Sequence, residues 1–305
     1  MNQRPIITGT DFSAAATEAV DIASALARRL DTRLVLVHVD ESYGIAAVDS
    51  QLFDAAVAHG RPELDRIADR LRGLGVNVEE KLFCGSAFDK LATAATESRA
   101  QLIVVGAVGH GLVRRLFVGS VAERTAETSA VPTLVVRPDN RLPSWIRGDH
   151  VLKVLVGYDF SPASDAALAW VNQLQKIGNC QITVLYTNWP PDEARRLGYE
   201  GPLPLTVNPT RIQKNLERDL NKRVGKFLPK RKAIAIVEPG WGNPEGYLFE
   251  MASRQRVDLI VVGSHQRHGL GRVLLGSVSR AILHHAKVSV VVVPPAERAT
   301  RKRRN

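Results

Sequence analysis

The sequence predicts an α/β protein built from two tandem domains, each a doubly wound, five-stranded parallel sheet. Three observations favour this fold class. The chain has 305 residues, which suits two domains of ordinary size. Each half alternates strand-like and helix-like runs, a pattern typical of parallel sheets whose strands are joined by crossover helices. The second half also repeats the landmarks of the first in the same order.

The internal repeat is clearest where each half begins. Residues 5–13 read PIITGTDFS and residues 154–161 read VLVGYDFS, so Asp159 follows Asp11 by 148 residues. Three later glycine pairs are 157 residues apart: Gly85 and Gly242, Gly106 and Gly263, Gly119 and Gly276. The second copy therefore carries about nine extra residues, which we expect in the loop between its second and third strands.

Local patterns justify the elements of the first copy. The first helix has small and aliphatic residues at helical spacing, and Asp11 or Ser13 can cap it. The apolar run at 102–105 is typical of a central strand covered on both faces. We expect residues 42–60 to be a loop or irregular helix. In order, the expected strands are 6–8, 33–39, 76–83, 102–106 and 132–137, and the helices are 13–30, 62–72, 87–99 and 116–128.

The second copy follows the same order, with a long Pro- and Gly-rich loop at 189–210. Its expected strands are 153–158, 181–187, 233–237, 259–263 and 289–293, and its helices are 161–176, 211–227, 245–254 and 273–285. We expect the final strand of each copy to make an edge contact between domains or subunits, because its apolar run needs cover. The expected divisions are domain 1 at 1–138, a linker at 139–150, domain 2 at 151–296 and a basic tail at 297–305.

Bulk composition favours a soluble globular protein, with 45% hydrophobic and 24% charged residues. The two cysteines, Cys84 and Cys180, are expected as separate thiols rather than as a disulfide or a metal site. No signal peptide is visible, and no stretch approaches the ~18 apolar residues of a membrane span. We therefore expect a cytoplasmic protein that does not interact with membranes.

The net charge of +10 raises the possibility of nucleic-acid binding. The basic residues gather in the C-terminal tail and in a second cluster at 222–232. Neither cluster lies within an RNA-binding or zinc-finger signature. We interpret both as solvated surface and do not expect specific nucleic-acid recognition.

A glycine-rich motif follows the central strand of the first copy. Gly106, Gly109, Gly119 and Ser120 have the spacing G-x2-G-x9-G-S, and the last two residues open a helix. Glycines let the backbone approach phosphates closely, while N–H groups at a helix start attract anions. These glycines could instead be simple turn residues. Three glycines and a serine directly after a buried strand favour phosphate binding.

This motif resembles the ATP-binding signature of the universal stress protein family, and the resemblance covers nearly the whole chain as two copies. It implies an adenine nucleotide alpha hydrolase-like fold with strand order 3-2-1-4-5 in each domain. That order would bring the ends of the first and fourth strands together at a ligand-binding crevice. By resemblance, Asp11 contacts the ribose or a phosphate-bound Mg²⁺, the backbone near Val39 meets adenine, and the phosphates bind at the glycine motif. The residues that the resemblance implies for this site are Thr10, Asp11, Val39, Gly106, Gly109, His110, Gly119 and Ser120.

The second copy departs from the signature at one position. Gln266 stands where the second glycine is expected, and a glutamine side chain there can crowd the phosphates. The remaining site residues of this copy are Asp159, Gly263, Gly276 and Ser277. We expect nucleotide in the first domain and weak or altered binding in the second.

Other candidate residues carry less information. His38 is expected to be a hydrogen-bonded core histidine. His265 and His268 flank the second phosphate segment and could contact an anion there, whereas a zinc site lacks a third ligand. Arg115 and Arg272 occupy equivalent places and could bind phosphate or form exposed ion pairs.

The leading functional interpretation is an ATP-binding regulatory protein of the stress response. A slow ATPase is an alternative, although no dedicated base or arginine finger is evident in the sequence. A third possibility is an interaction protein whose nucleotide sites have decayed. The expected partners are an adenine nucleotide and either a second copy of the chain or the other domain, in a pseudo-dimer.

Overall fold

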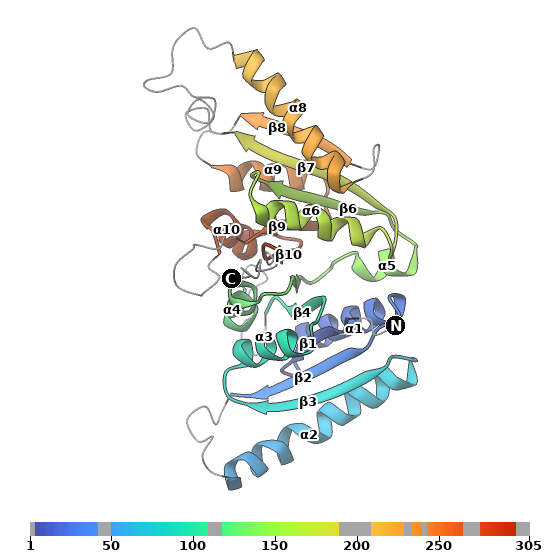
Figure 1. Ribbon diagram of the computed structural model, residues 1–305. Helices are drawn as coiled ribbons and strands as arrows, with labels where there is room; N and C mark the ends of the chain where they lie inside the picture. The colour runs from blue at the N-terminus through green and yellow to red at the C-terminus, as the bar shows by residue number, and fades with distance from the viewer. Residues whose placement is uncertain are drawn as a thin grey trace, which may run out of the picture.

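The computed structural model describes residues 4–41, 50–108, 118–188, 209–228, 233–239, 243–264 and 275–296. Within them, ten strands form one continuous sheet in the order β3-β2-β1-β4-β5-β10-β9-β6-β7-β8 (Figure 1). Each half therefore has the expected order 3-2-1-4-5. The first repeat contributes β1 (Ile6–Thr10), β2 (Leu34–Asp40), β3 (Val78–Cys84), β4 (Leu102–Gly106) and β5 (Thr133–Val136). The second contributes β6 (Leu152–Tyr158), β7 (Cys180–Asn188), β8 (Ala233–Pro239), β9 (Leu259–Gly263) and β10 (Ser289–Val293).

The two repeats are joined through their final strands. β5 and β10 pair antiparallel, with Leu134 opposite Val291, whereas neighbouring strands within each repeat pair parallel. The pairing satisfies backbone groups that would otherwise be open edges of both half-sheets. The expected contact between the final strands is thus confirmed, and it lies within one chain.

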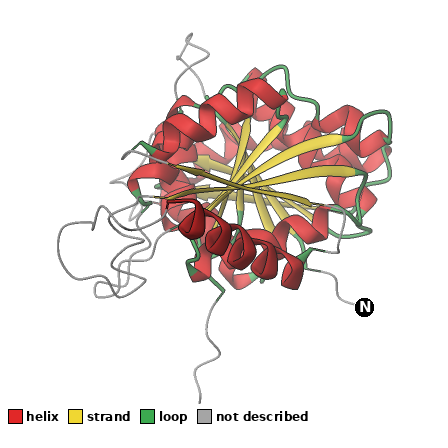
Figure 2. Cartoon of the chain, turned by 90° about the horizontal axis from the view of Figure 1, so that it is seen from above, coloured by secondary structure: helices red, strands yellow, loops and turns green. Residues whose placement is uncertain are grey.

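Helices cover both faces of the sheet, and Figure 2 shows the twisted strands between the two helical layers. Alternate strand residues point to opposite faces, so Ile6 and Ile7 belong to different halves of the core. One face packs against α1 (Ala14–Arg29), α2 (Ser50–Gly73), α5 (Leu142–Arg147), α6 (Pro162–Leu174) and α8 (Pro209–Phe227). The other packs against α3 (Ala87–Glu97), α4 (Ser120–Thr128), α9 (Pro244–Gln255) and α10 (Ser277–His285).

Helix α2 differs from the sequence expectation. It begins at Ser50 and continues through Pro62, where we expected the helix to start. A proline inside a helix removes one backbone hydrogen bond, which a long helix packed on a sheet can tolerate. Gly60 lies against the sheet in this extended part, and a Cβ there would come within 2.7 Å of His38 Cδ2. The absence of a side chain therefore lets α2 approach β2 closely.

The expected linker also contains structure. Helix α5 buries Leu142 and Trp145 in the core and ends at Gly148, whose φ of 91° is left-handed. The linker residues thus pack the two repeats together instead of only connecting them. Cys84 and Cys180 form no disulfide, as expected. Among the described helices, none combines the length and the apolar character that a membrane span requires.

Candidate functional site

A cleft opens at the carboxyl ends of β1, β2 and β4, on the face covered by α3 and α4. Its volume is about 370 Å³, within the usual range for small-molecule sites. One part of the wall is apolar and the other combines backbone with polar side chains. The apolar part includes Val37, Val39, Ala87, Leu91 and Val108, and the polar part includes Thr10, Asp11, Glu41, Gly106, Gly119 and Ser120.

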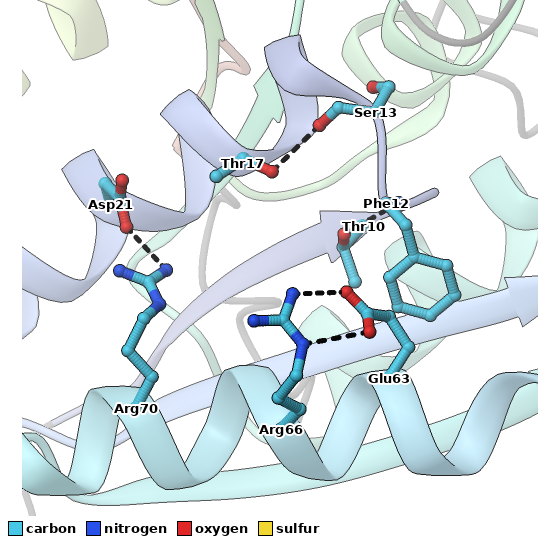
Figure 3. Close-up of polar contacts among 8 residues, drawn as sticks. All are labelled: Thr10, Phe12, Ser13, Thr17, Asp21, Glu63, Arg66 and Arg70. Atoms are coloured by element: carbon cyan, nitrogen blue, oxygen red, sulfur yellow. Dashed lines mark hydrogen bonds and ion pairs between the residues drawn. The ribbon is translucent and has the colours of Figure 1, made fainter.

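The turn between β1 and α1 presents Asp11 to this cleft. Asp11 is exposed, and its Oδ1 accepts a hydrogen bond from the Ser13 N–H at 3.0 Å. The Ser13 hydroxyl in turn accepts from the Ala16 N–H at 3.2 Å and caps α1. Figure 3 shows Thr10, Phe12 and Ser13 around this turn. The helix cap thereby fixes the position of the Asp11 carboxylate.

Phe12 adopts a left-handed backbone conformation, with a φ of 65°. This conformation costs a non-glycine residue free energy, so other contacts must offset it. The Phe12 ring lies 4.3 Å from the His38 ring, measured between centroids. His38 is buried, and its Nδ1 lies 2.8 Å from the Thr10 carbonyl oxygen. The expectation of a hydrogen-bonded core histidine is confirmed, and this histidine also supports the turn that carries Asp11.

The outer face of α1 is held to α2 by charge. Arg70 on α2 pairs with Asp21 on α1 at 2.7 Å, whereas Arg66 pairs with Glu63 of its own helix (Figure 3). All four side chains lie outside the cleft wall. Of the two ion pairs, only Arg70–Asp21 connects the two helices, and both lie away from the cleft wall.

Gly106 is required by the packing of the helix next to it. A Cβ on Gly106 would lie 2.7 Å from the Ala15 carbonyl oxygen, which is too close for any side chain. The neighbouring atoms belong to the backbone of α1 and cannot turn away. The sequence predicted that glycine here would let the backbone approach phosphate. The structure shows an additional role, because glycine lets the first turn of α1 pack against the end of β4.

The start of α4 closes the polar end of the cleft. Gly119 is the N-cap residue of α4 and, as a glycine, has no side chain to cap the first turn of this helix. Ser120 is the first helical residue and is exposed in the cleft wall. The N–H groups of such a turn point outward and carry partial positive charge, so they favour an anion.

Glu41 is a cleft residue that the sequence analysis missed. It follows β2, and its Oε1 accepts a hydrogen bond from the Ala87 N–H at 2.9 Å, at the start of α3. Glu41 and Asp11 are the two charged side chains in the described part of the cleft wall. An acidic residue directly after a buried strand was the signal available in the sequence.

Several expected site residues lie outside the described parts of the chain. These are Gly109 and His110 of the first glycine motif, Gln266, His265 and His268 of the second, and the two arginines Arg115 and Arg272. Within the described residues, no group of three potential ligands could hold a metal ion.

Comparison with known proteins shows the family to which the chain belongs. The pattern of the universal stress protein family matches residues 2–137 and again residues 151–294. The chain belongs to the universal stress protein family. The two matches agree with the internal repeat and with the two half-sheets of the structure.

Relatives in this family include proteins of similar length. The chain is 28% identical over 314 residues to a universal stress protein of Mycolicibacterium smegmatis, a match that covers 95% of this chain and 97% of that protein. It is 28% identical over 201 residues to one of Mycobacterium tuberculosis, covering 64% of this chain and 62% of the relative. In that match the chain spans less than two thirds of the relative's length. A universal stress protein structure from Archaeoglobus fulgidus shares the fold, with a TM-score of 0.69 at 17% identity over 97% of this chain and 100% of the other.

The second universal stress protein repeat has an equivalent but smaller cleft. Its volume is about 210 Å³, and its wall includes the expected residues Asp159, Gly263 and Ser277, while Gly276 caps α10. Leu185 replaces Val37 in the apolar wall, and the side chains equivalent to Ala16, Val39 and Ala122 carry hydroxyls. The replacements are Ser164, Thr187 and Ser279.

The turn before the second cleft repeats the geometry of the first. Asp159 Oδ1 accepts from the Ser161 N–H at 3.0 Å, and Phe160 has a φ of 61°. Here the Phe160 ring packs against Tyr186, which stands in the place of His38, with 4.9 Å between ring centroids. The turn is therefore conserved between the repeats even though the cleft walls differ.

Proposed function

We propose that the first repeat binds an adenine nucleotide, such as ATP. We further propose that this chain acts in the stress response and that the bound nucleotide regulates it. The observation that carries the proposal is the cleft itself. It combines an apolar wall, two carboxylates and a helix start whose N-cap residue is glycine, at the carboxyl ends of parallel strands. Ligands of open α/β sheets bind at this edge, where the strand order reverses.

The apolar wall suits a flat, weakly polar ring. Val37, Val39 and Leu91 line it, and aliphatic side chains can pack on both faces of an adenine. Carboxylates suit ribose hydroxyls, because an ionised carboxylate only accepts hydrogen bonds and a hydroxyl can donate one. Asp11 and Glu41 both line the cleft beside the apolar wall.

The phosphates would meet the start of α4. The N–H groups near Gly119 and Ser120 and the Ser120 hydroxyl can donate to phosphate oxygens. Lysine and arginine are absent from the described part of the wall, so neutral donors would carry most of this interaction there. Mg²⁺ would fit beside Asp11, because this ion is commonly held by one or two carboxylates and substrate phosphates.

Releasing and identifying any bound nucleotide from the purified, denatured protein tests the proposal directly. Calorimetry with ATP, ADP and cAMP on the nucleotide-free protein then measures affinity. We expect Asp11→Asn to weaken nucleotide binding about tenfold or more, because a charge-assisted hydrogen bond is lost. The matched control is Asp69→Asn, which removes an exposed carboxylate on α2. Equal affinity in the wild type and Asp11→Asn would reject the site.

ATP hydrolysis is the second candidate function. Single-turnover measurements, with Mg²⁺ in excess over ATP, distinguish ATP hydrolysis from regulatory ATP binding. ADP formation that is faster than the spontaneous hydrolysis of free ATP, and that Asp11→Asn abolishes, would favour an enzyme. Stable ATP in the complex would favour the regulatory role.

A further inference from the structure

A second cavity lies where the two repeats meet, on the face opposite to the nucleotide cleft. Its volume is about 440 Å³, larger than that of the cleft. It is formed by the ends of α1 and α6 over the middle of the sheet, with α5 beside them. Figure 1 shows α5 next to α1 and α6 at this junction. Both repeats therefore contribute to its wall.

The interior of this cavity is apolar. Ile6, Leu102, Leu134 and Leu259 form its floor on the sheet, and all four are buried. Its sides come from both helices, from α5 and from the residues just after α1 and α6: Leu26, Leu30, Leu142, Trp145, Trp170, Leu174 and Ile177. The space is partly open to solvent, so it is a pocket between the helices and not a void enclosed in the core. Its volume lies within the usual range for small-molecule sites.

The mouth of the cavity is polar and basic. Arg29, Gln101, Gln173 and Lys176 contribute to it, and the described part of the wall has no acidic side chain. Arg29 Nε donates a hydrogen bond to the Ile177 carbonyl oxygen at 3.1 Å, which links α1 to the second repeat. Arg29 and Lys176 are both exposed, so an occupant with a polar end could meet both cations and solvent there.

We propose that this cavity binds a small amphipathic acid, with its hydrocarbon or aromatic body inside and its carboxylate at Arg29 and Lys176. Apolar walls favour an apolar body over water, because such cavities offer water few hydrogen-bond partners. The carboxylate end follows from the basic rim. Both helices end at this rim, and helix C-termini carry partial negative charge. The preference for an acid therefore depends on the two basic side chains.

The proposed site is independent of the nucleotide cleft. Helix α1 contacts the cleft through Ala16 near its start and the cavity through Leu26 and Arg29 near its end. The two sites share no residue. Loss of one ligand by substitution at its own site can therefore be measured with the other site intact.

Calorimetry of the full chain with decanoate tests the proposal, and decanol serves as the uncharged analogue. We expect saturable decanoate binding at one site per chain, tighter than that of decanol. Lys176→Glu should weaken decanoate binding about tenfold, because it replaces an attraction by a repulsion, and should leave decanol binding unchanged. Lys222→Glu is the matched control, since Lys222 is exposed on α8 and lies outside the cavity wall.

A second variant tests the location of the apolar body. Leu30→Trp should fill part of the cavity and abolish binding of both compounds, whereas Leu74→Trp, at a residue 52% exposed, should bind like the wild type. Absence of saturable decanoate binding would overturn the proposal. Binding that is unaffected by both Lys176→Glu and Leu30→Trp would overturn it as well, because the ligand would then occupy another place. Equal binding of decanoate and decanol would refute the preference for an acid.

Discussion

His284 Nε2 on α10 lies 2.9 Å from Glu123 Oε1 on α4, so an ion pair or hydrogen bond connects the two repeats beside the β5–β10 junction. Arg280 on α10 pairs with Glu127 on α4 in the same interface. In the internal repeat, Glu123 is equivalent to Arg280 and Glu127 to His284. The first repeat thus contributes acidic side chains to this interface, and the second contributes basic ones. Pairing two first repeats would place Glu123 opposite Glu127, so charge favours pairing of a first repeat with a second repeat.

We predict that reversing one charge in this interface destabilises the protein and that reversing both restores it. Glu127→Arg should lower the free energy of unfolding by about 1 kcal/mol, because it opposes Arg280 with a like charge at a partly exposed site. The double variant Glu127→Arg, Arg280→Glu should recover most of that loss in urea unfolding. Glu250→Arg is the control, since Glu250 pairs with Arg254 on the exposed face of α9. Additive effects of the two interface changes would show that the pair contributes nothing.

Arg137 contributes a second interaction across the junction. It lies just after β5, only 1% exposed, and its guanidinium donates to the carbonyl oxygen of Leu283 at 2.9 Å and of His284 at 3.2 Å. These carbonyls end α10, where a cation is favourable. Arg137→Met should cost about 2 kcal/mol of unfolding free energy, because one buried and one partly buried carbonyl oxygen lose a charged donor. Chemical denaturation should show no comparable loss for Arg141→Met, at an exposed position.

The fold was predictable because the internal repeat and the apolar runs both indicate parallel sheets with buried central strands. The run from Leu102 to Val105 predicts a central strand, and β4 is buried on both faces. An edge contact of the final strands, between domains or subunits, was expected from their need for cover. The single ten-stranded sheet was not specified, because an uncovered edge strand can equally well pair with another subunit.

Elements that depend on tertiary packing were harder to predict. A proline is a common helix start signal, so the sequence placed the start of α2 at Pro62, although packing on the sheet sustains a longer helix. The polar segment after β5 looked like a linker because a six-residue helix gives too short a pattern to recognise. The close contact of Gly106 with the backbone of α1 is a tertiary contact. No local sequence pattern around Gly106 predicts it.

The close approach at Gly106 leads to a third prediction. Gly106→Ala should destabilise the protein by about 2 kcal/mol, because the new methyl group would press against the Ala15 backbone and displace α1. The displacement would also move the Asp11 turn and weaken nucleotide binding. Gly73→Ala provides the control, since a Cβ at Gly73 meets nothing within 4 Å. Thermal unfolding and nucleotide titration of both variants check this, and wild-type behaviour of Gly106→Ala would show that α1 can shift without cost.

The final prediction concerns the difference between the repeats. We expect one nucleotide per chain, bound in the first repeat. The second cleft is smaller, about 210 Å³ against about 370 Å³, and has hydroxyls where the first has methyl groups. The apolar wall of the second cleft contains Leu185, which is one methylene larger than its equivalent Val37 in the first. In addition, the sequence places Gln266 where the phosphate segment of the first repeat has Gly109.

Three substitutions distinguish the apolar end from the phosphate end. Val37→Leu gives the first cleft the leucine that lines the second, and we expect it to weaken binding about tenfold by filling the space needed for the base. Gln266→Gly restores the glycine motif in the second repeat, and calorimetry should show the stoichiometry rising from one toward two if the glutamine side chain is the main obstacle. A stoichiometry that stays at one, but rises when Leu185→Val is added, would locate the obstacle in the apolar wall instead. Two equal sites in the wild type would contradict the predicted asymmetry, because neither the narrower wall nor Gln266 would then limit binding.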